Sequence, residues 1–258
     1  MKTALITGAS SGIGATFAQE LATKNYNLVL VARSEDKLQQ LAQQLQEQHQ
    51  IQAEVIVQDL TVAEAGQKIF HQTEQQGLTI DLLINNAGFG DYGAFSDRPL
   101  SKQMAMIQLN ITALVELTGL FLPVMKQRGD GAIINLSSIA AFQPLPYMSV
   151  YAASKAFVLN FTEALWAENQ DSGVRFLALC PGPTESQFFE VADFPASFNK
   201  NGNNLTPAED VVRDALNALE KNQSTLVTGG IGNQLIVNIP RFLPRDWLVN
   251  AVEKQFRA

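Results

Sequence analysis

Short apolar runs and polar, helix-forming stretches alternate along most of the chain. Six of the apolar runs are rich in Val, Ile and Leu and do not alternate with polar positions. An apolar run of this kind is typical of a strand that is covered on both faces, as in a parallel sheet. The predicted strands are residues 4–7, 28–32, 53–57, 82–85, 132–136 and 174–180.

The stretches between these runs predict helices, among them residues 34–49 and 61–76. Regular alternation of strands and helices favours an α/β, Rossmann-like, doubly wound fold with a parallel sheet. A later helix is expected to have Thr206 as its N-cap and Pro207 at its first position. Residues 224–228 are then predicted to add a seventh strand to the sheet.

The regular pattern ends after Cys180. Residues 183–205 contain several Phe and Pro residues and have no clean period. A stretch of this length without regular structure is usually functional, so we predict a substrate lid there. Residues 231–258 are expected to form short helices as a C-terminal extension. No repeat or linker divides the chain, and residues 1–258 are therefore expected to form a single dinucleotide-binding catalytic domain.

Composition narrows the possible functions. The formal net charge of −7 disfavours nucleic acid and anionic membranes as partners. The one cysteine, Cys180, excludes an internal disulfide, and its apolar neighbours predict a buried structural thiol rather than a nucleophile. No cluster of His, Cys and carboxylates has the spacing of a metal site. No run reaches the length of a membrane span, and the N-terminus leads straight into a glycine-rich turn, so we expect a cytoplasmic protein.

The first predicted strand runs into the sequence Thr7-Gly8-Ala9-Ser10-Ser11-Gly12-Ile13-Gly14, after which a helix begins at once. Glycines at this point let the backbone approach a pyrophosphate, whose charge is stabilised by the helix N-terminus. The alternative is a tight turn that binds no ligand, but the position after the first strand of a doubly wound fold favours a dinucleotide. The predicted contacts are Gly8, Ser10, Ser11, Gly12, Ile13 and Gly14.

The end of the second strand indicates which dinucleotide binds. An NAD site has an acidic residue here to bind the ribose 2′-hydroxyl, whereas this chain has Arg33, which suits the 2′-phosphate of NADP(H). Arg33 could also be a plain surface charge. Asp59 and Leu60 end the third strand, and residues 85–88 end the fourth, where the adenosine should lie. Asp59 could equally cap a helix at Thr61. From these segments, Asp59, Leu60, Asn86, Ala87 and Gly88 are predicted to bind the cofactor.

Tyr151 and Lys155 lie four residues apart in the predicted helix 150–167 and share one face. Such a pair is common by chance, but the preceding strand ends in Ser137 and Ser138 at the ligand edge. Reduction of a ketone needs a proton donor, and the ordinary tyrosine pKa of about 10 is about three units too high for easy proton exchange near neutral pH. An ammonium about 4 Å away stabilises the tyrosinate by about 4 kcal/mol at an effective dielectric of about 20, which is enough to lower the pKa by that amount. Lys155 is therefore expected to lower the pKa of Tyr151, while Ser138 holds the substrate carbonyl.

Together these motifs resemble the short-chain dehydrogenase/reductase family, and the resemblance covers residues 1 to about 230. It implies that Tyr151 is the general acid/base, that Ser138 rather than Ser137 orients the substrate, and that Lys155 also holds the nicotinamide ribose. It further implies that Asn110 binds a water linking Lys155 to solvent, although by itself Asn110 is typical of a helix surface. The segments that carry the resemblance are Thr7 to Gly14, Asn85 to Gly88, Asn110, Ser138, Tyr151 to Lys155, and Pro181-Gly182.

Within the family, Ser11 followed by Arg33 resembles an NADP(H)-preferring subgroup. Pro181, Gly182 and Thr184 are expected at the nicotinamide; the threonine that the family often has is replaced here by Ser186. Residues 122–125 are similar to lipid-type 3-oxoacyl and hydroxysteroid reductases, without the usual membrane segment of these enzymes. The resemblance also implies a homodimer through the helices that carry Asn110 and Tyr151, with a tetramer as the alternative.

These observations predict an NADP(H)-dependent oxidoreductase that interconverts a ketone or aldehyde and its alcohol. The many aromatic residues in three segments at the ligand edge indicate a hydrophobic substrate, although each of them could simply pack the lid onto the core. A non-catalytic NADP(H) sensor is the alternative, and a methyltransferase would have an acid in place of Arg33. The predicted substrate contacts are Ser138, Phe142, Tyr147, Phe188 and Phe189, with Phe89, Tyr92, Phe194 and Phe198 nearby.

Overall fold

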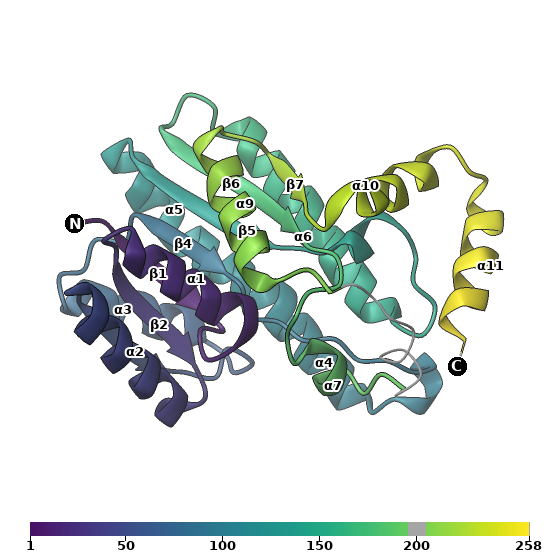
Figure 1. Ribbon diagram of the computed structural model, residues 1–258, viewed down its shortest axis with the longest axis horizontal. Coiled ribbons are helices and arrows are strands. Elements are labelled where there is room, and N and C mark those ends of the chain that lie inside the picture. Colours follow the sequence, from purple (N-terminus) through teal and green to yellow (C-terminus); the bar gives the residue numbers. More distant parts are fainter. Residues whose placement is uncertain (196–204, 258) are drawn as a thin grey trace.

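A parallel sheet of seven strands forms the centre of the computed structural model, which describes residues 1–195 and 205–257 (Figure 1). The strand order is β3-β2-β1-β4-β5-β6-β7, and every neighbouring pair is parallel. The order in which strands are added to the sheet reverses between β1 and β4, which creates the switch point where such sheets bind ligands. The strands are Thr3–Thr7 (β1), Asn27–Ala32 (β2), Ala53–Val57 (β3), Leu82–Asn85 (β4), Gly131–Leu136 (β5), Val174–Cys180 (β6) and Thr225–Val227 (β7).

Helices cover both faces of the sheet, as the predicted doubly wound fold requires. One face packs against α1 (Gly12–Thr23), α2 (Glu35–His49) and α9 (Ala208–Glu220). The opposite face packs against α3 (Ala65–Gln75) and α5 (Leu114–Arg128), with the end of α6 (Ser149–Glu168) beside them. A short α4 (Leu100–Ile107) continues into α5 through the π-helical residues Gln108–Ala113. Because both faces are covered, the strands need no alternation of polar residues.

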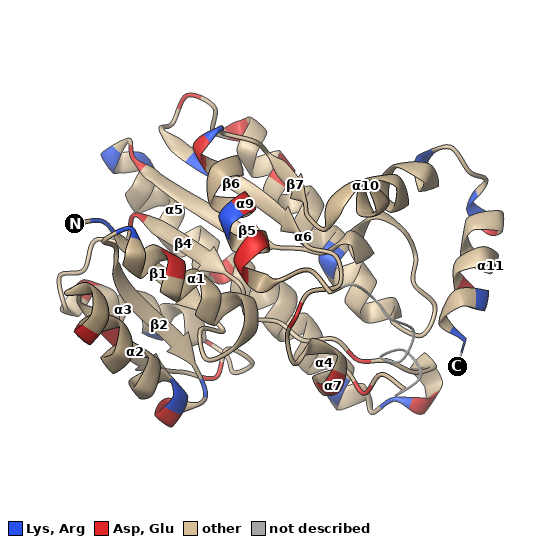
Figure 2. Ribbon diagram, viewed as in Figure 1, with Lys and Arg blue, Asp and Glu red and all other residues tan. Residues whose placement is uncertain are grey.

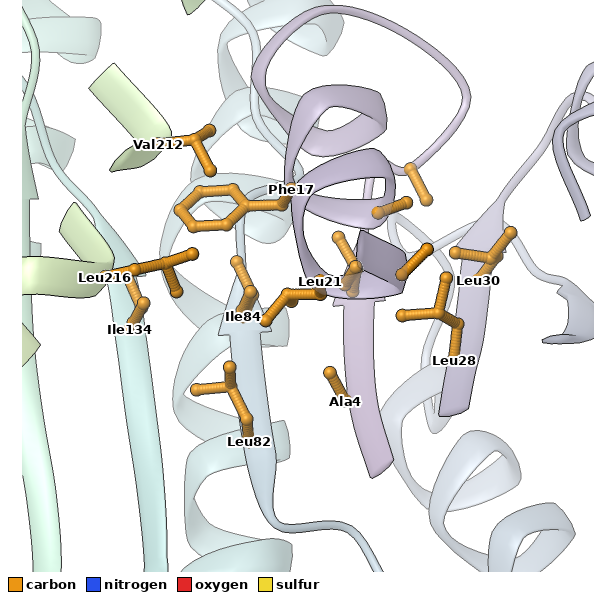
Figure 3. Close-up of a cluster of buried hydrophobic side chains, with 14 of the residues drawn as sticks. Ala4, Phe17, Leu21, Leu28, Leu30, Leu82, Ile84, Ile134, Val212 and Leu216 are labelled. Carbon is orange, nitrogen blue, oxygen red and sulfur yellow. The ribbon is translucent and has the colours of Figure 1, made fainter. Parts of the chain in front are cut away.

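Phe17 and Leu21 are one helical turn apart on α1 and point together at the sheet and at α9 (Figure 3). Their neighbours include Ile84 of β4 and Val212 and Leu216 of α9, all of which are buried. Phe17 is fully buried, and replacing such a ring by alanine typically costs about 3–5 kcal/mol. This core fixes the start of α1 above the end of β1.

Three expectations need correction. The helix predicted to start at Thr61 starts at Ala65, because the Asp59 carboxylate accepts hydrogen bonds from the Thr61 backbone (2.8 Å) and hydroxyl (2.7 Å) and makes a turn there. The N-cap of α9 is Pro207 and not Thr206, whose backbone bridges to the base of the lid at Thr184.

The helical run Leu100–Arg128 is long and apolar enough to cross a membrane by length and composition, contrary to the expectation that no run is. In the fold its buried side chains Leu117, Phe121 and Met125 pack on the sheet, whereas Met104 and Val124 are exposed.

The chain leaves the sheet twice near its end. Of the segment 183–205, predicted as a lid and called the lid below, the structure describes residues 183–195, which include α7 (Phe188–Val191), and residue 205; Phe198 lies outside the described residues. After β7, α10 (Gly230–Asn238) and α11 (Arg245–Phe256) extend to one side of the sheet (Figure 1). Leu248, Val252 and Phe256 of α11 pack into an apolar cluster that also holds Tyr92 and Tyr151.

Candidate active site

The glycine-rich turn brings the start of α1 close to the end of β4. A Cβ atom on Gly14 would lie 2.3 Å from the Gly8 carbonyl oxygen and 2.5 Å from the Asn86 side-chain nitrogen, so no larger residue fits. Asn86 donates to the carbonyl oxygens of Thr7 (2.9 Å) and Gly8 (3.3 Å). Ser11 is the N-cap of α1, but its side chain makes no cap hydrogen bond, so it does not occupy the first N–H groups of the helix.

Two charged residues lie at the far end of this site, after β2 and β3. Arg33 is exposed and follows Ala32 directly. Hydrogen bonds from Thr61 and the positive charge of Arg33 hold the pKa of Asp59 below its ordinary value. Asp59 is therefore ionised at neutral pH, and the two side chains place opposite charges at one end of the site.

The segment after β4 packs against the helices that follow it. Asn110 is almost fully buried, and its side chain bonds the Phe89 backbone twice: the amide nitrogen donates to the carbonyl (3.0 Å), and the oxygen accepts from the N–H (3.1 Å). A Cβ atom on Gly88 would lie 2.9 Å from this oxygen and 3.4 Å from the Lys155 nitrogen. Glycine at position 88 therefore lets the side chains of Asn110 and Lys155 both approach the backbone there. The interpretation of Asn110 as a surface residue from its position alone is wrong.

Tyr151, Ser138 and Lys155 meet where β5 ends. Ser138 follows β5 and its hydroxyl accepts from the Ala140 N–H (3.1 Å). Ser137 is turned away, since its hydroxyl donates to the Lys155 carbonyl (2.7 Å). The Lys155 ammonium donates to the Leu136 carbonyl (2.7 Å) and lies 5.8 Å from the centre of the Tyr151 ring. These contacts favour Ser138 over Ser137 as the serine that faces a substrate.

The expected effect of Lys155 on Tyr151 is absent in this structure. Burial raises the pKa of Tyr151 to about 12, against a smaller lowering by a hydrogen bond with Ser138. Burial also lowers the pKa of Lys155 to about 8. The expectation considered only the attraction between two charges, whereas removing both groups from water opposes their ionisation more strongly.

Most of the predicted residues line one cavity of about 1230 Å³. Its wall runs from Arg33 and Asp59, past the glycine-rich turn, to Ser138, Tyr151 and Lys155. Pockets for a single drug-sized ligand measure about 300–1,000 Å³, so this cavity has room for more than one ligand. Other predicted residues in the wall are Gly8, Ser10, Ser11, Gly12, Ile13, Leu60, Asn86, Ala87, Gly88, Pro181, Gly182, Thr184, Phe188 and Phe189.

Four of the predicted site residues are not in the wall, and neither is Tyr92, which packs in the cluster around Tyr151. Gly14 and Asn110 lie behind the wall and act through the packing described above. Phe142, predicted to contact substrate, is the last residue of a short helical turn and packs instead against the buried cluster of Leu159, Ala178 and Cys180. Tyr147 is also misplaced by the prediction: its hydroxyl donates to Glu253 (2.9 Å) and so fastens α11.

Part of the wall is absent from the sequence prediction. Ile236 of α10, Val191 of the lid, and Leu248, Val252 and Phe256 of α11 line the apolar end, beside Phe194, which was expected there. The only signal in the sequence is the spacing of residues 248, 252 and 256 along one helix face. That spacing predicts a packed helix but not which part of the fold it packs on.

Comparison with known proteins agrees with this geometry. A family model described as short chain dehydrogenase matches residues 2–193. The very-long-chain 3-oxoacyl-CoA reductase of Rattus norvegicus is 31% identical over 252 residues, which is 95% of this chain and 76% of the rat protein.

Two solved structures are similar over almost the whole chain. A short-chain dehydrogenase from Sphingobium yanoikuyae, in complex with NADPH, is 31% identical, with a TM-score of 0.83 over 99% of this chain and 95% of the other. A bulky-bulky ketone specific alcohol dehydrogenase from Comamonas testosteroni is 30% identical, with a TM-score of 0.80 over 94% and 92%. Sequence, fold and site agree, and the chain belongs to the short chain dehydrogenase family.

Proposed function

We propose that this oxidoreductase uses NADP(H) to interconvert a hydrophobic ketone or aldehyde and its alcohol. The carrying observation is the single cavity that joins Arg33 at one end to Tyr151 and an apolar wall at the other. Bound NADP(H) would supply or accept the hydride at the Tyr151 end. The relatives described above include an NADPH complex, a dehydrogenase of bulky ketones and a very-long-chain 3-oxoacyl-CoA reductase, and they support the same assignment.

The residues present fit NADP(H). The first turn of α1 offers backbone donors beside the glycine-rich turn, which suits a pyrophosphate. Arg33 can pair with a 2′-phosphate, and no carboxylate follows β2 directly. Lys155 needs only to exchange its hydrogen bond with the Leu136 carbonyl for one with a ribose hydroxyl. Pro181, Gly182 and Thr184 then bound the nicotinamide end.

Each group of the chain has one task in this reaction. Ser138 donates a hydrogen bond to the substrate carbonyl and holds it beside the Tyr151 hydroxyl. Burial raises the pKa of Tyr151, so its hydroxyl is protonated before the reaction. It can still give that proton to the forming alkoxide, because an alkoxide is a stronger base than a tyrosinate. Lys155 stays cationic near neutral pH, because its lowered pKa of about 8 is still above 7. A non-catalytic sensor has no use for this proton-transfer set.

A hydrophobic substrate is supported by the wall around Tyr151. The Phe188 ring lies 5.2 Å from the Tyr151 ring, and Phe189 and Phe194 pack beside it. Each buried methylene of a substrate contributes about 0.8 kcal/mol, which is about a fourfold gain in kcat/KM. Activity with NADPH on straight-chain ketones or aldehydes of rising length should increase accordingly.

The experiment measures NADPH oxidation over that series for the wild type and for a variant in which a large side chain fills part of the cavity. Ala251 lines the cavity, so Ala251→Trp should reduce kcat/KM for long substrates far more than for short ones. Asn250→Trp, on the neighbouring exposed position outside the wall, is the matched control. A flat series, or best activity on small sugars, overturns the hydrophobic substrate. If the protein turns over none of the carbonyls, the assignment as an enzyme is wrong and a non-catalytic sensor is favoured.

We further propose a homodimer and a cytoplasmic location. Val124 on α5 and Phe157 on α6 are large apolar side chains exposed to solvent, and Phe157 stacks on Phe161. A second copy would cover this surface, and light scattering at micromolar concentration should show two chains. A single chain would refute the dimer, and four chains would indicate the tetramer.

The proposed cytoplasmic location is supported by the free Cys180, which suits a reducing compartment. Recovery of the protein with membranes after cell fractionation would contradict that location.

A further inference from the structure

An ion cluster joins the lid to the segment after β4. Asp91 in that segment has a side chain with no exposed surface. Its carboxylate accepts hydrogen bonds from Arg98 (Nε, 2.8 Å) and Gln103 (2.6 Å) and pairs with the Lys102 ammonium (2.7 Å). The lid residue Asp193 completes the cluster, at 2.5 Å from Arg98 and 2.9 Å from Lys102. Figure 2 shows blue and red ribbon together around α4 and α7.

The charges in this cluster balance. Two carboxylates, Asp91 and Asp193, face two cations, Arg98 and Lys102. Burial by itself would raise the pKa of Asp91, but hydrogen bonds from the two cations hold it below its ordinary value. Asp91 is therefore ionised at neutral pH and pairs with both cations independently of Asp193. Asp193 is the member that belongs to another segment, and its side chain is 55% exposed.

Asp193 lies beside the residues that form the apolar wall. The carbonyl of Ala192 accepts from the Tyr92 N–H (2.8 Å), and the Phe194 N–H donates to the Phe189 carbonyl (3.0 Å). The rings of Tyr92 and Phe194 are 4.9 Å apart. Asp193 has a φ of 58°, a left-handed conformation in which Asp and Asn are enriched among non-glycine residues. Asp193 therefore lies in the turn between residues that contact the aromatic wall.

We propose that Asp193 is a positioning residue: its ion pairs with Arg98 and Lys102 hold the lid, and with it the aromatic wall, over the substrate carbonyl. The substrate part of this inference rests on the proposed function. Isolated exposed ion pairs contribute little, because two long side chains must be ordered to form them. Here Asp91 has already ordered both cations, so Asp193 gains its contacts at a smaller entropic cost.

The test compares Asp193→Asn with Glu190→Gln. Asparagine keeps the side-chain shape and the tolerance of a positive φ but removes the charge. Glu190 is an exposed acid on α7 with no ion pair among the described residues, so its variant removes the same charge from the same segment. Asp193→Asn should raise KM for a long hydrophobic carbonyl by about 2- to 10-fold, the range that two partly exposed pairs support. Its kcat and its affinity for NADPH should stay within about twofold of the wild type, and Glu190→Gln should match the wild type throughout.

Salt gives a second readout that a merely structural role would not produce. Screening shortens the Debye length from about 10 Å at 0.1 M to about 3 Å at 1 M. The KM of the wild type should therefore rise with NaCl toward that of Asp193→Asn, while the KM of the variant changes little. A salt response that is identical in both proteins overturns the proposal.

Hydrogen exchange tests the lid without any substrate. The amides of Tyr92 and Phe194 should exchange faster in Asp193→Asn than in the wild type, and at the wild-type rate in Glu190→Gln. Unchanged exchange in Asp193→Asn overturns the positioning role even if KM rises. If these amides exchange faster in Asp193→Asn but the wild type reduces no carbonyl, the proposed function is wrong, while the role of the ion pairs in holding the lid is still supported.

Discussion

The side-chain nitrogen of Asn110 donates to the Ser154 hydroxyl at 3.1 Å, and this contact joins the π-helical segment to α6. Ser154 in turn donates to the Tyr151 carbonyl (2.7 Å). Asn110 also bonds the Phe89 backbone in both directions. One buried amide therefore holds together the segment after β4 and the helix that carries Tyr151 and Lys155.

Asn110→Leu should destabilise the protein and slow the reaction. The variant leaves the Phe89 N–H and carbonyl buried without partners, and each such group costs about 1–3 kcal/mol. Chemical denaturation should show a drop in the free energy of unfolding of that order, with an unchanged m-value. Ser154→Ala, which removes only the link to α6, should lose less. Equal stability of Asn110→Leu and wild type would contradict this account.

Tyr151→Phe should bind NADPH normally yet lose at least about 10²-fold in kcat, the low end of the effect of a general acid. Phenylalanine keeps the ring that packs against Phe188 and removes only the hydroxyl. Fluorescence titration of NADPH supplies the binding control. A variant that keeps most of its turnover would exclude Tyr151 as the proton donor.

Arg33→Ala should remove the preference for NADPH over NADH. A charge-assisted contact with the 2′-phosphate is worth about 1.5–3 kcal/mol, or about 10- to 150-fold in affinity. NADH lacks that phosphate, so its affinity should hardly change and serves as the internal control. Equal dissociation constants of NADPH and NADH for the wild type would refute the assignment.

Lys155 makes stability depend on pH in a predictable direction. Its pKa is about 8 in the folded protein and about 10.5 in the unfolded chain, so the unfolded state binds more protons between these values. The contribution of Lys155 to stability is therefore present above pH 10.5 and is lost as the pH falls through 8. Relative to Lys155→Met, the wild type should gain about 2 kcal/mol in unfolding free energy between pH 7 and pH 10. A constant difference would mean that Lys155 is not desolvated.

The sequence was sufficient for the sheet and for the positions of the site segments. Runs such as residues 28–32 and 174–180 are covered on both faces, and that environment leaves a strong pattern. Since parallel strands end at one edge, the residues that follow them could be placed together. The predicted NADP(H) preference is supported by Arg33, which follows β2 and lines the cavity.

The errors arise where a residue depends on partners distant in the chain. Phe142 and Tyr147 lie in the right segment, yet one packs on β6 and the other holds Glu253. The pKa of Tyr151 depends on how completely the fold excludes water, which no local pattern encodes. Asp193 is one acid among many until the fold brings it to Arg98.

The only thiol of the chain, Cys180, closes β6 with no exposed surface, and burial raises the pKa of this thiol to about 12. A maleimide can therefore alkylate the native protein only when β6 opens. The labelling rate becomes a built-in gauge of local unfolding at the strand next to Pro181 and Gly182. A nucleotide bound beside these residues should slow the labelling, so a time course of mass spectra would report binding without an engineered probe.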